Sequence, residues 1–222
     1  YETLRSAGFA NVSIDLMFSI PGQTMALWQA DLEQAVALRP DHFSAYNLTY
    51  EEDTDFLTRH QSGELDTNED RDADLFYQAI DFLETSGYAH YEISNYARAG
   101  FESQHNRSYW AGADYLGLGP GAVSTIAGQR WKTLPDTAAY IRATKAGLDT
   151  RTDIEILTDE DRRTEAIALR LRTREGVPMT LLPSLDPVES LIEQGLVEEK
   201  NGYLVLTRAG KALADPIAGE LV

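Results

Sequence analysis

The 222-residue sequence contains no cysteine and few basic residues. Without cysteine the chain cannot form a disulfide, use a catalytic thiolate or hold a metal or cluster through thiolates. Nineteen Lys and Arg against 36 Asp and Glu give a net charge of −17, which disfavours binding to nucleic-acid phosphates. No apolar run approaches the roughly 18 residues that a membrane span requires. The sequence therefore predicts no nucleic-acid partner and no stable membrane insertion.

The remaining composition is that of an ordinary globular protein. With 43% hydrophobic and 25% charged residues, the chain can bury a sizeable core in one large domain, or in one domain with a small appendix. Residues 1–9 resemble the tail of a helix and no initiator Met precedes them. We therefore expect a C-terminal fragment of a longer, cytoplasmic protein.

Strand and helix patterns alternate over the first hundred residues. Strands are predicted at 12–20, 42–50 and 88–96, with helices at 24–39 and 69–86 between them. The first strand is mostly apolar along its length, as expected of a strand covered on both faces. This order predicts βαβ units, and hence an α/β fold with a parallel sheet or part of a (β/α) barrel. Ligands bind at the carboxyl ends of strands in such folds, where the sequence has the polar residues Gln23, Thr49, Glu51, Ser94 and Asn95.

Asp15 is the exception within the first apolar strand. A carboxylate in a buried strand must be paired or functional, because leaving it unpaired away from water is costly. We consider a ligand-binding role and a structural hydrogen bond, and favour the ligand-binding role.

Residues 101–131 lose this periodicity and contain a dense cluster of functional side chains. His105, Asn106, Tyr109 and Trp110 lie within six residues, and the glycine-rich run 117–122 follows closely. The cluster could bind a flat ligand with polar edges. Alternatively, the histidine and the amide brace a loop, and the tryptophan belongs to the core. The glycines do not form a phosphate-binding P-loop, because no lysine or long helix follows them; they indicate close approach of the backbone to a ligand or a neighbouring strand.

A second unit is predicted at the C-terminal end. A short strand at 115–119, a helix at 133–146 and a polar connector at 148–158 lead to a boundary, which gives domains 1–150 and 151–222. Two helices, a hairpin with an Asn-Gly turn and a last helix then predict a small α+β winged-helix-like domain. The second of these helices, residues 187–194, has two glutamates and no basic residue, which favours packing or protein contact over DNA binding.

Three blocks resemble one known family. Residues 14–24 (IDLMFSIPGQT), 91–97 (YEISNYA) and 117–124 (GLGPGAVS) are similar, in the same order, to segments of radical S-adenosylmethionine (SAM) enzymes of the oxygen-independent coproporphyrinogen III oxidase-like family. The blocks extend over essentially the whole chain and are jointly specific. One departure is Ser19, where the family usually has glycine.

The resemblance implies a partial (β/α) barrel that holds a [4Fe–4S] cluster and SAM. It places Asp15 at the nucleoside of SAM, with Thr49 and Val123 lining the same pocket. The three cysteines that hold the cluster in the family lie upstream of the matching blocks. This chain, which has no cysteine, cannot perform the radical chemistry alone.

The cluster at 105–110 distinguishes two branches of the family. His-Asn-x-x-Tyr-Trp is similar to the signature of the haem chaperone (HemW-type) branch and is absent from the oxidases. The resemblance implies that Asn106 belongs to a haem site, in which His105 is the candidate iron ligand and Tyr109 and Trp110 form aromatic walls. The partners it implies are haem or porphyrin, with apo-haemoproteins as recipients. A homodimer is considered as well, although the sequence does not decide the oligomeric state.

Three functions are therefore considered. The first is a haem chaperone that uses the cluster and SAM for assembly or control. The second is an oxidoreductase that decarboxylates the propionate side chains of coproporphyrinogen III. The third, an acidic ligand-binding regulator with a winged helix, is disfavoured by the charge. The stretch from His105 to Trp110 favours the first.

Overall fold

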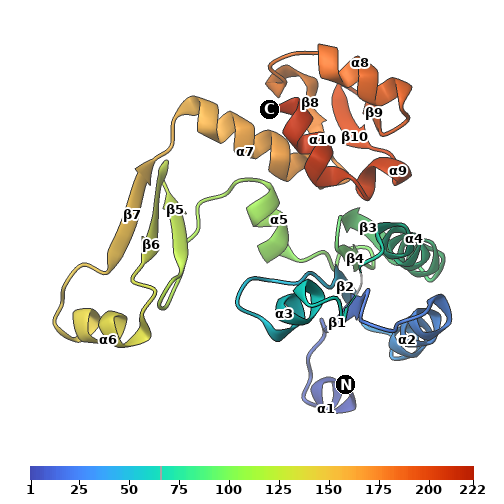
Figure 1. The fold of residues 1–222 in the computed structure, drawn as a ribbon, viewed down its shortest axis with the longest axis horizontal. Coiled ribbons are helices and arrows are strands. Elements are labelled where there is room, and N and C mark those ends of the chain that lie inside the picture. Colours follow the sequence, from blue (N-terminus) through green and yellow to red (C-terminus); the bar gives the residue numbers. More distant parts are fainter. Residues whose placement is uncertain (66) are drawn as a thin grey trace.

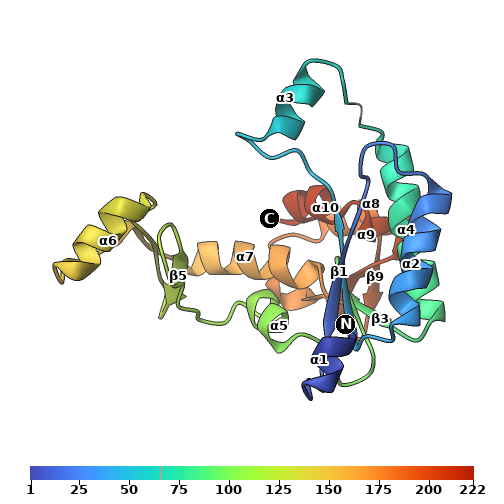
Figure 2. The ribbon, with the colours of Figure 1, turned by 90° about the horizontal axis from the view of Figure 1, so that it is seen from below.

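The computed structural model describes residues 1–65 and 67–222 and shows a mixed α/β protein with three parts (Figure 1). A four-stranded sheet with helices packed on it lies next to a C-terminal domain. An arm, made of a three-stranded sheet and a helix, extends away from both. Figure 2 shows the same separation from below, so the arm is an extension of the molecule rather than a layer of its core.

The four-stranded sheet is built on one parallel pair. β1 (Ser13–Phe18) and β2 (His42–Asn47) run parallel in register along their whole length, and α2 (Met25–Ala37) connects them. This βαβ unit is the one that the sequence predicts. The sheet order is β1-β2-β4-β3.

The predicted third parallel strand at 88–96 is wrong. The segment forms a hairpin of β3 (Ala89–Glu92) and β4 (Asn95–Ala97), and β4 pairs antiparallel with β2. The chain reverses at Ile93 and Ser94, where the Glu92 carboxylate accepts hydrogen bonds from the Ser94 N–H (3.1 Å) and from the side-chain amide of Asn95. Such local side-chain bonds favour a turn within an otherwise strand-like pattern.

One face of this sheet is covered by α2 and α4 (Glu69–Thr85). Trp28 is fully buried between the two helices, and its indole N–H donates to the Leu75 carbonyl at 3.0 Å. The buried apolar side chains of this core come from both helices and from the sheet: Phe18, Trp28, Leu32, Ala35, Phe43, Ala45, Leu75, Phe76, Ala79, Ile80, Leu83, Tyr88 and Tyr96.

The other face of β1 is open, which corrects the prediction that this strand is covered on both faces. Ser13, Asp15 and Met17 are exposed, whereas Ile14 and Leu16 on the opposite face are half-buried. β1 is also an edge strand in the sheet order. Helices therefore cover a single face of β1 here.

The arm contains an antiparallel sheet of β5 (Val123–Ile126), β6 (Gln129–Thr133) and β7 (Arg151–Ile156), with α6 (Thr137–Lys145) between the last two strands. The predicted connector at 148–158 is thus largely a strand. Its Arg-Thr-Asp-Ile-Glu-Ile sequence alternates charged and less polar side chains, as a strand does. The segment was predicted as a connector because of its many polar residues, and the alternation was overlooked. The predicted strand at 115–119 is reduced to a bridge between Tyr115 and Thr125.

The glycine-rich run approaches a neighbouring strand, as one reading of the sequence predicts. A Cβ atom at Gly117 would overlap the carbonyl oxygen of Val123 on β5. The proposed domain boundary at residue 150 falls immediately before β7, which pairs with β6. The division into domains 1–150 and 151–222 stays a proposal.

The C-terminal part has the predicted winged-helix-like arrangement. The hairpin of β9 (Val197–Lys200) and β10 (Tyr203–Leu206) turns at Asn201 and Gly202, both with positive φ, as an Asn-Gly turn requires. β8 (Val177–Pro178) completes its sheet. The helices around it are α7 (Asp159–Leu171), the 3₁₀ turn η1 (Met179–Leu181), α8 (Asp186–Glu193), α9 (Arg208–Lys211) and α10 (Ala214–Leu221).

Three short helices lie outside these units: α1 (Glu2–Ser6), α3 (Asp55–Gln61) and α5 (Gln104–Trp110). α1 is tied to the sheet by the ion pair of Arg5 with Asp41 at 2.6 Å. Among the residues that the structure describes, no helix has the length and apolarity needed to cross a membrane.

Candidate functional site

The sequence cluster at 105–110 forms helix α5. Ser103 caps the helix by accepting a hydrogen bond from the Asn106 N–H at 3.2 Å, and Gly112, with φ of 70°, follows its end. Seven residues are too few to show a clear helical period, which explains why the sequence pattern did not predict this helix. α5 lies between the arm and the four-stranded sheet, close to α7 (Figure 1).

One face of α5 carries exposed aromatic side chains that contact one another. His105 and Tyr109 are one helical turn apart, and their rings meet edge to face at 4.8 Å. Tyr109 meets Tyr115 in the same manner, also at 4.8 Å. Within the described chain the His105 imidazole makes no hydrogen bond. The structure therefore brings together two predicted haem residues and adds Tyr115, which sequence reasoning missed although it lies only six residues further along.

The other predicted haem residues lie on a different face of α5. Asn106 and Trp110 are half-buried, and the Arg172 guanidinium lies over the Trp110 ring at 5.6 Å. Successive side chains on a helix project about 100° apart, so Tyr109 and Trp110 do not face each other across one pocket. Trp110 instead attaches α5 to the end of α7.

Glu92 lies close to the Trp110 indole and is nearly fully buried. Burial raises the pKa of this carboxyl group, while the Ser94 N–H, the nearby indole N–H of Trp110 and the charge of Arg172 act in the opposite direction. The Trp110 N–H is buried without a hydrogen bond of normal geometry in the described part of the chain, yet it is close enough to Glu92 to favour its charged form. Glu92 thus connects the β3–β4 hairpin with α5.

The structure separates one of the three residues predicted to contact SAM from the other two. Asp15 is exposed on β1 opposite Ser44, and Thr49 follows the end of β2, the neighbouring strand. The Thr49 hydroxyl donates to Glu51 at 2.7 Å. Val123 lies on β5 in the arm, and Figures 1 and 2 both place β5 far from β1.

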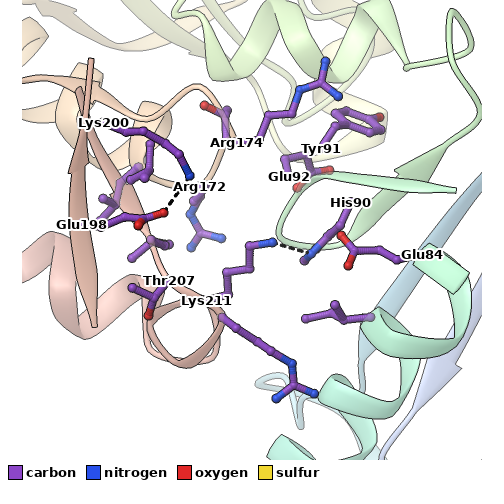
Figure 3. A pocket seen from close by; sticks show the side chains of 16 residues that line it. Glu84, His90, Tyr91, Glu92, Arg172, Arg174, Glu198, Lys200, Thr207 and Lys211 are labelled. Atoms are coloured by element: carbon purple, nitrogen blue, oxygen red, sulfur yellow. Dashed lines mark hydrogen bonds and ion pairs between the residues drawn. The ribbon is translucent and has the colours of Figure 1, made fainter. Parts of the chain in front are cut away.

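A cavity of about 280 Å³ lies where the four-stranded sheet meets the C-terminal domain. β3 contributes His90 to it and α9 contributes Lys211, and Figure 3 shows these two side chains pointing toward one another. Arg172 and Lys200 reach into the same space from the end of α7 and from β9. His90 and Lys211 are 121 positions apart in the sequence, and no short motif identified the residues of this cavity.

The tautomer of His90 follows from its partners. Its Nε2 lies 2.9 Å from the Ile93 carbonyl, which can only accept, so this nitrogen carries the proton. Nδ1 then accepts from the Lys211 ammonium at 3.0 Å. Burial, assisted by the positive charge of Lys211, lowers the pKa of His90 to about 3, and burial also lowers the pKa of Lys211. The imidazole is therefore neutral and rigidly held, stacked on Tyr96 at 4.3 Å.

Similarity to known proteins extends over the whole chain. Residues 157–213 match the family described as HemN C-terminal domain. The chain is 39% identical over 177 residues to Heme chaperone HemW of Lactococcus lactis, with 79% of this chain and 46% of the relative covered. It is 33% identical to the Bacillus subtilis Heme chaperone HemW, with 99% of this chain and 61% of the relative covered. The chain thus spans about half of the length of these relatives.

A solved structure shares the fold. The coproporphyrinogen III oxidase HemN from Escherichia coli, described as a radical SAM enzyme, matches with a TM-score of 0.79 at 20% identity. The match covers 99% of this chain and 56% of that one. The predicted fold class, part of a partial (β/α) barrel followed by a small winged-helix-like domain, is confirmed. The chain belongs to the radical SAM family of HemN-like proteins, in its HemW-type branch.

Proposed function

We propose that this protein is a cytoplasmic haem chaperone, which binds haem and passes it to apo-haemoproteins. The exposed aromatic face of α5 is the observation that carries the proposal. A neutral imidazole is a common axial ligand of haem iron, and aromatic rings pack well against a porphyrin plane. The names of the HemW relatives support the same function.

The residues of α5 fit haem in a specific way. His105 is exposed and makes no hydrogen bond to the described residues, so coordination of iron breaks no hydrogen bond there. Tyr109 and Tyr115 provide aromatic surface beside it. Trp110 belongs to the proposed site as a residue that holds α5 against Arg172, and Asn106 is a proposed haem-site residue on the strength of the sequence resemblance. Because the His105 face is open, haem could leave it without unfolding the chain, as transfer requires.

The residues of this chain do not fit a [4Fe–4S] cluster. No cysteine is present, and the described residues contain no group of three His, Asp or Glu side chains placed to hold a metal ion. We propose that the full-length protein binds the cluster and SAM and forms a homodimer. Asp15, Thr49 and Val123 are proposed SAM contacts on the strength of the sequence resemblance. For Val123 to join Asp15, the arm would have to approach β1 more closely than it does here.

A haem titration tests the assignment of His105. We expect His105→Ala to weaken haem binding to the full chain by at least about tenfold and to change the Soret band, because the iron loses its protein ligand. His60→Ala is the matched control, since His60 is half-buried on α3, a different helix. An unchanged affinity and Soret band in His105→Ala would contradict the proposal.

The alternative function is oxidative decarboxylation of coproporphyrinogen III. The shared fold with HemN makes this the natural rival. Full-length protein with a reconstituted cluster should show no decarboxylation of coproporphyrinogen III. Robust turnover would favour the oxidase over the chaperone.

A further inference from the structure

The cavity between the sheet and the C-terminal domain has an unusual charge for this protein. Although the chain carries a net charge of −17, the cavity is lined by more cationic than anionic side chains. The cations are Arg172, Arg174, Lys200, Arg208 and Lys211, and the carboxylates are Glu84, Glu92 and Glu198. A concave site lined by cations raises the local concentration of small anions, even in a protein whose net charge is negative.

Two of the cations are committed to carboxylates outside the cavity. Arg174 pairs with Glu102 at 2.6 Å, and Arg208 pairs with Asp81 at 2.6 Å. Neither Glu102 nor Asp81 lines the cavity. Arg174 also meets Glu175, and Arg208 holds Asp81 through two nitrogens, so both guanidinium groups have fewer donors left for a ligand than Arg172.

The other three cations keep hydrogen-bond donors available. Arg172 pairs with Asp215 through one terminal nitrogen, which leaves other N–H groups of the guanidinium. Lys200 pairs with Glu198 at 2.9 Å on the exposed hairpin. Figure 3 shows Arg172, Lys200 and Lys211 converging on one space from three different elements.

Lys211 is the distinctive member of this group. It is half-buried, and in the described chain no carboxylate lies within 4.0 Å of its ammonium; its partner there is the neutral His90. A lysine that only packed two domains together would be better stabilised by an ion pair, because burying an uncompensated charge is costly. One of its three N–H groups is used, and two are left for a ligand. His90, which is 5% exposed and anchored to the Ile93 carbonyl, holds the ammonium in position.

We propose that this cavity binds a small anion that carries phosphate or carboxylate groups, held by Lys211, Arg172 and Lys200. Arg172 supplies the planar donor pair suited to such oxygens, and the two lysines act as point charges. The volume of about 280 Å³ admits a small metabolite but not a porphyrin and its substituents. The site is separate from the His105 face of α5, so the inference goes beyond the proposed haem function.

Isothermal titration of the full chain at low salt tests the proposal. The probes are inorganic phosphate, pyrophosphate and tricarballylate, which carry one phosphate, two phosphates and three carboxylates. We expect at least one probe to bind with one-to-one stoichiometry, and the better probe identifies phosphate or carboxylate as the group recognised. Binding should weaken at high salt because the contacts are ionic.

Variants locate the site. Lys211→Gln should weaken binding by at least about tenfold, since it removes a charge-assisted contact. Lys200→Gln, an exposed position where folding is not at risk, should weaken it by about threefold. Lys145→Gln on α6 is the matched control and should bind as the unmodified chain does. The proposal is overturned if no probe binds up to about 10 mM, or if the control weakens binding as much as the two cavity variants.

Discussion

Ser19 has a backbone conformation that its side chain does not favour. Its φ of 61° lies in the left-handed region, directly after β1, where the family usually has glycine. The side chain is buried, and its hydroxyl has no hydrogen-bond partner among the described residues. The position thus combines backbone strain with an unpaired polar group.

We expect Ser19→Gly to stabilise the protein by about 1 kcal/mol. Relief of a left-handed non-glycine conformation and of the buried hydroxyl outweighs the loss of about 0.5–1 kcal/mol from the greater freedom of glycine in the unfolded chain. Urea denaturation measures the change. Ser19→Ala removes the hydroxyl but keeps the Cβ atom, so it should gain less. A glycine variant less stable than the original would contradict this account.

At the scale of elements, α7 connects the three parts of the molecule. It is a helix of the C-terminal domain that begins shortly after β7 of the arm, and Thr173, just after its end, forms a bridge with Glu92 of β3 in the four-stranded sheet. Its first turn carries a capping box: Thr158 accepts from the Asp161 N–H at 3.1 Å, and the Asp161 carboxylate accepts from the Thr158 N–H at 2.8 Å. The start of α7 is therefore specified by local sequence.

Removal of this cap should destabilise the protein. We expect Thr158→Ala to lower the free energy of unfolding by about 1 kcal/mol, because backbone N–H groups at the helix start lose their acceptor. Thr164→Ala within the exposed face of α7 is the control and should be neutral or slightly stabilising, since alanine favours helix. Equal effects of the two substitutions in urea denaturation would show that the cap is dispensable.

At the scale of the whole molecule, the contact between the sheet and the C-terminal domain contains the buried, neutral His90. Its pKa in the folded protein is lowered from 6.5 to about 3, by burial first and by Lys211 second. As the pH falls below 6.5, the unfolded chain takes up a proton that the folded chain does not. The stability contributed by the neutral imidazole is therefore present above about pH 6.5 and lost progressively toward pH 3. Glu92, whose pKa is raised, opposes this loss.

We expect the free energy of unfolding to fall between about pH 7 and about pH 4.5, and to fall less steeply in His90→Gln. Glutamine retains a donor for the Ile93 carbonyl but does not titrate. Urea denaturation across this range gives both slopes. His60→Gln on α3 is the control and should follow the unmodified chain. A His90→Gln slope as steep as the original would assign the loss to other groups.

The sequence alone determined the features that depend on neighbours along the chain. The β1–α2–β2 unit and the long helix α4 follow from hydrophobic periodicity, and the turn at Asn201 and Gly202 follows from residues that accept positive φ. The close approach at Gly117 was also predicted from a short stretch. These features are local, so local residue types suffice to predict them. The assignment of His105 as an iron ligand came from the family resemblance and stays a proposal.

Only the tertiary structure decided what depends on residues far apart. It set β4 antiparallel to β2, left the Asp15 face of β1 open and placed Val123 in the arm. It divided His105 and Trp110 between two faces of α5. It also brought Lys211 to His90 across 121 positions of the chain. Such contacts arise from the packing of whole elements, which neither periodicity nor a short motif encodes.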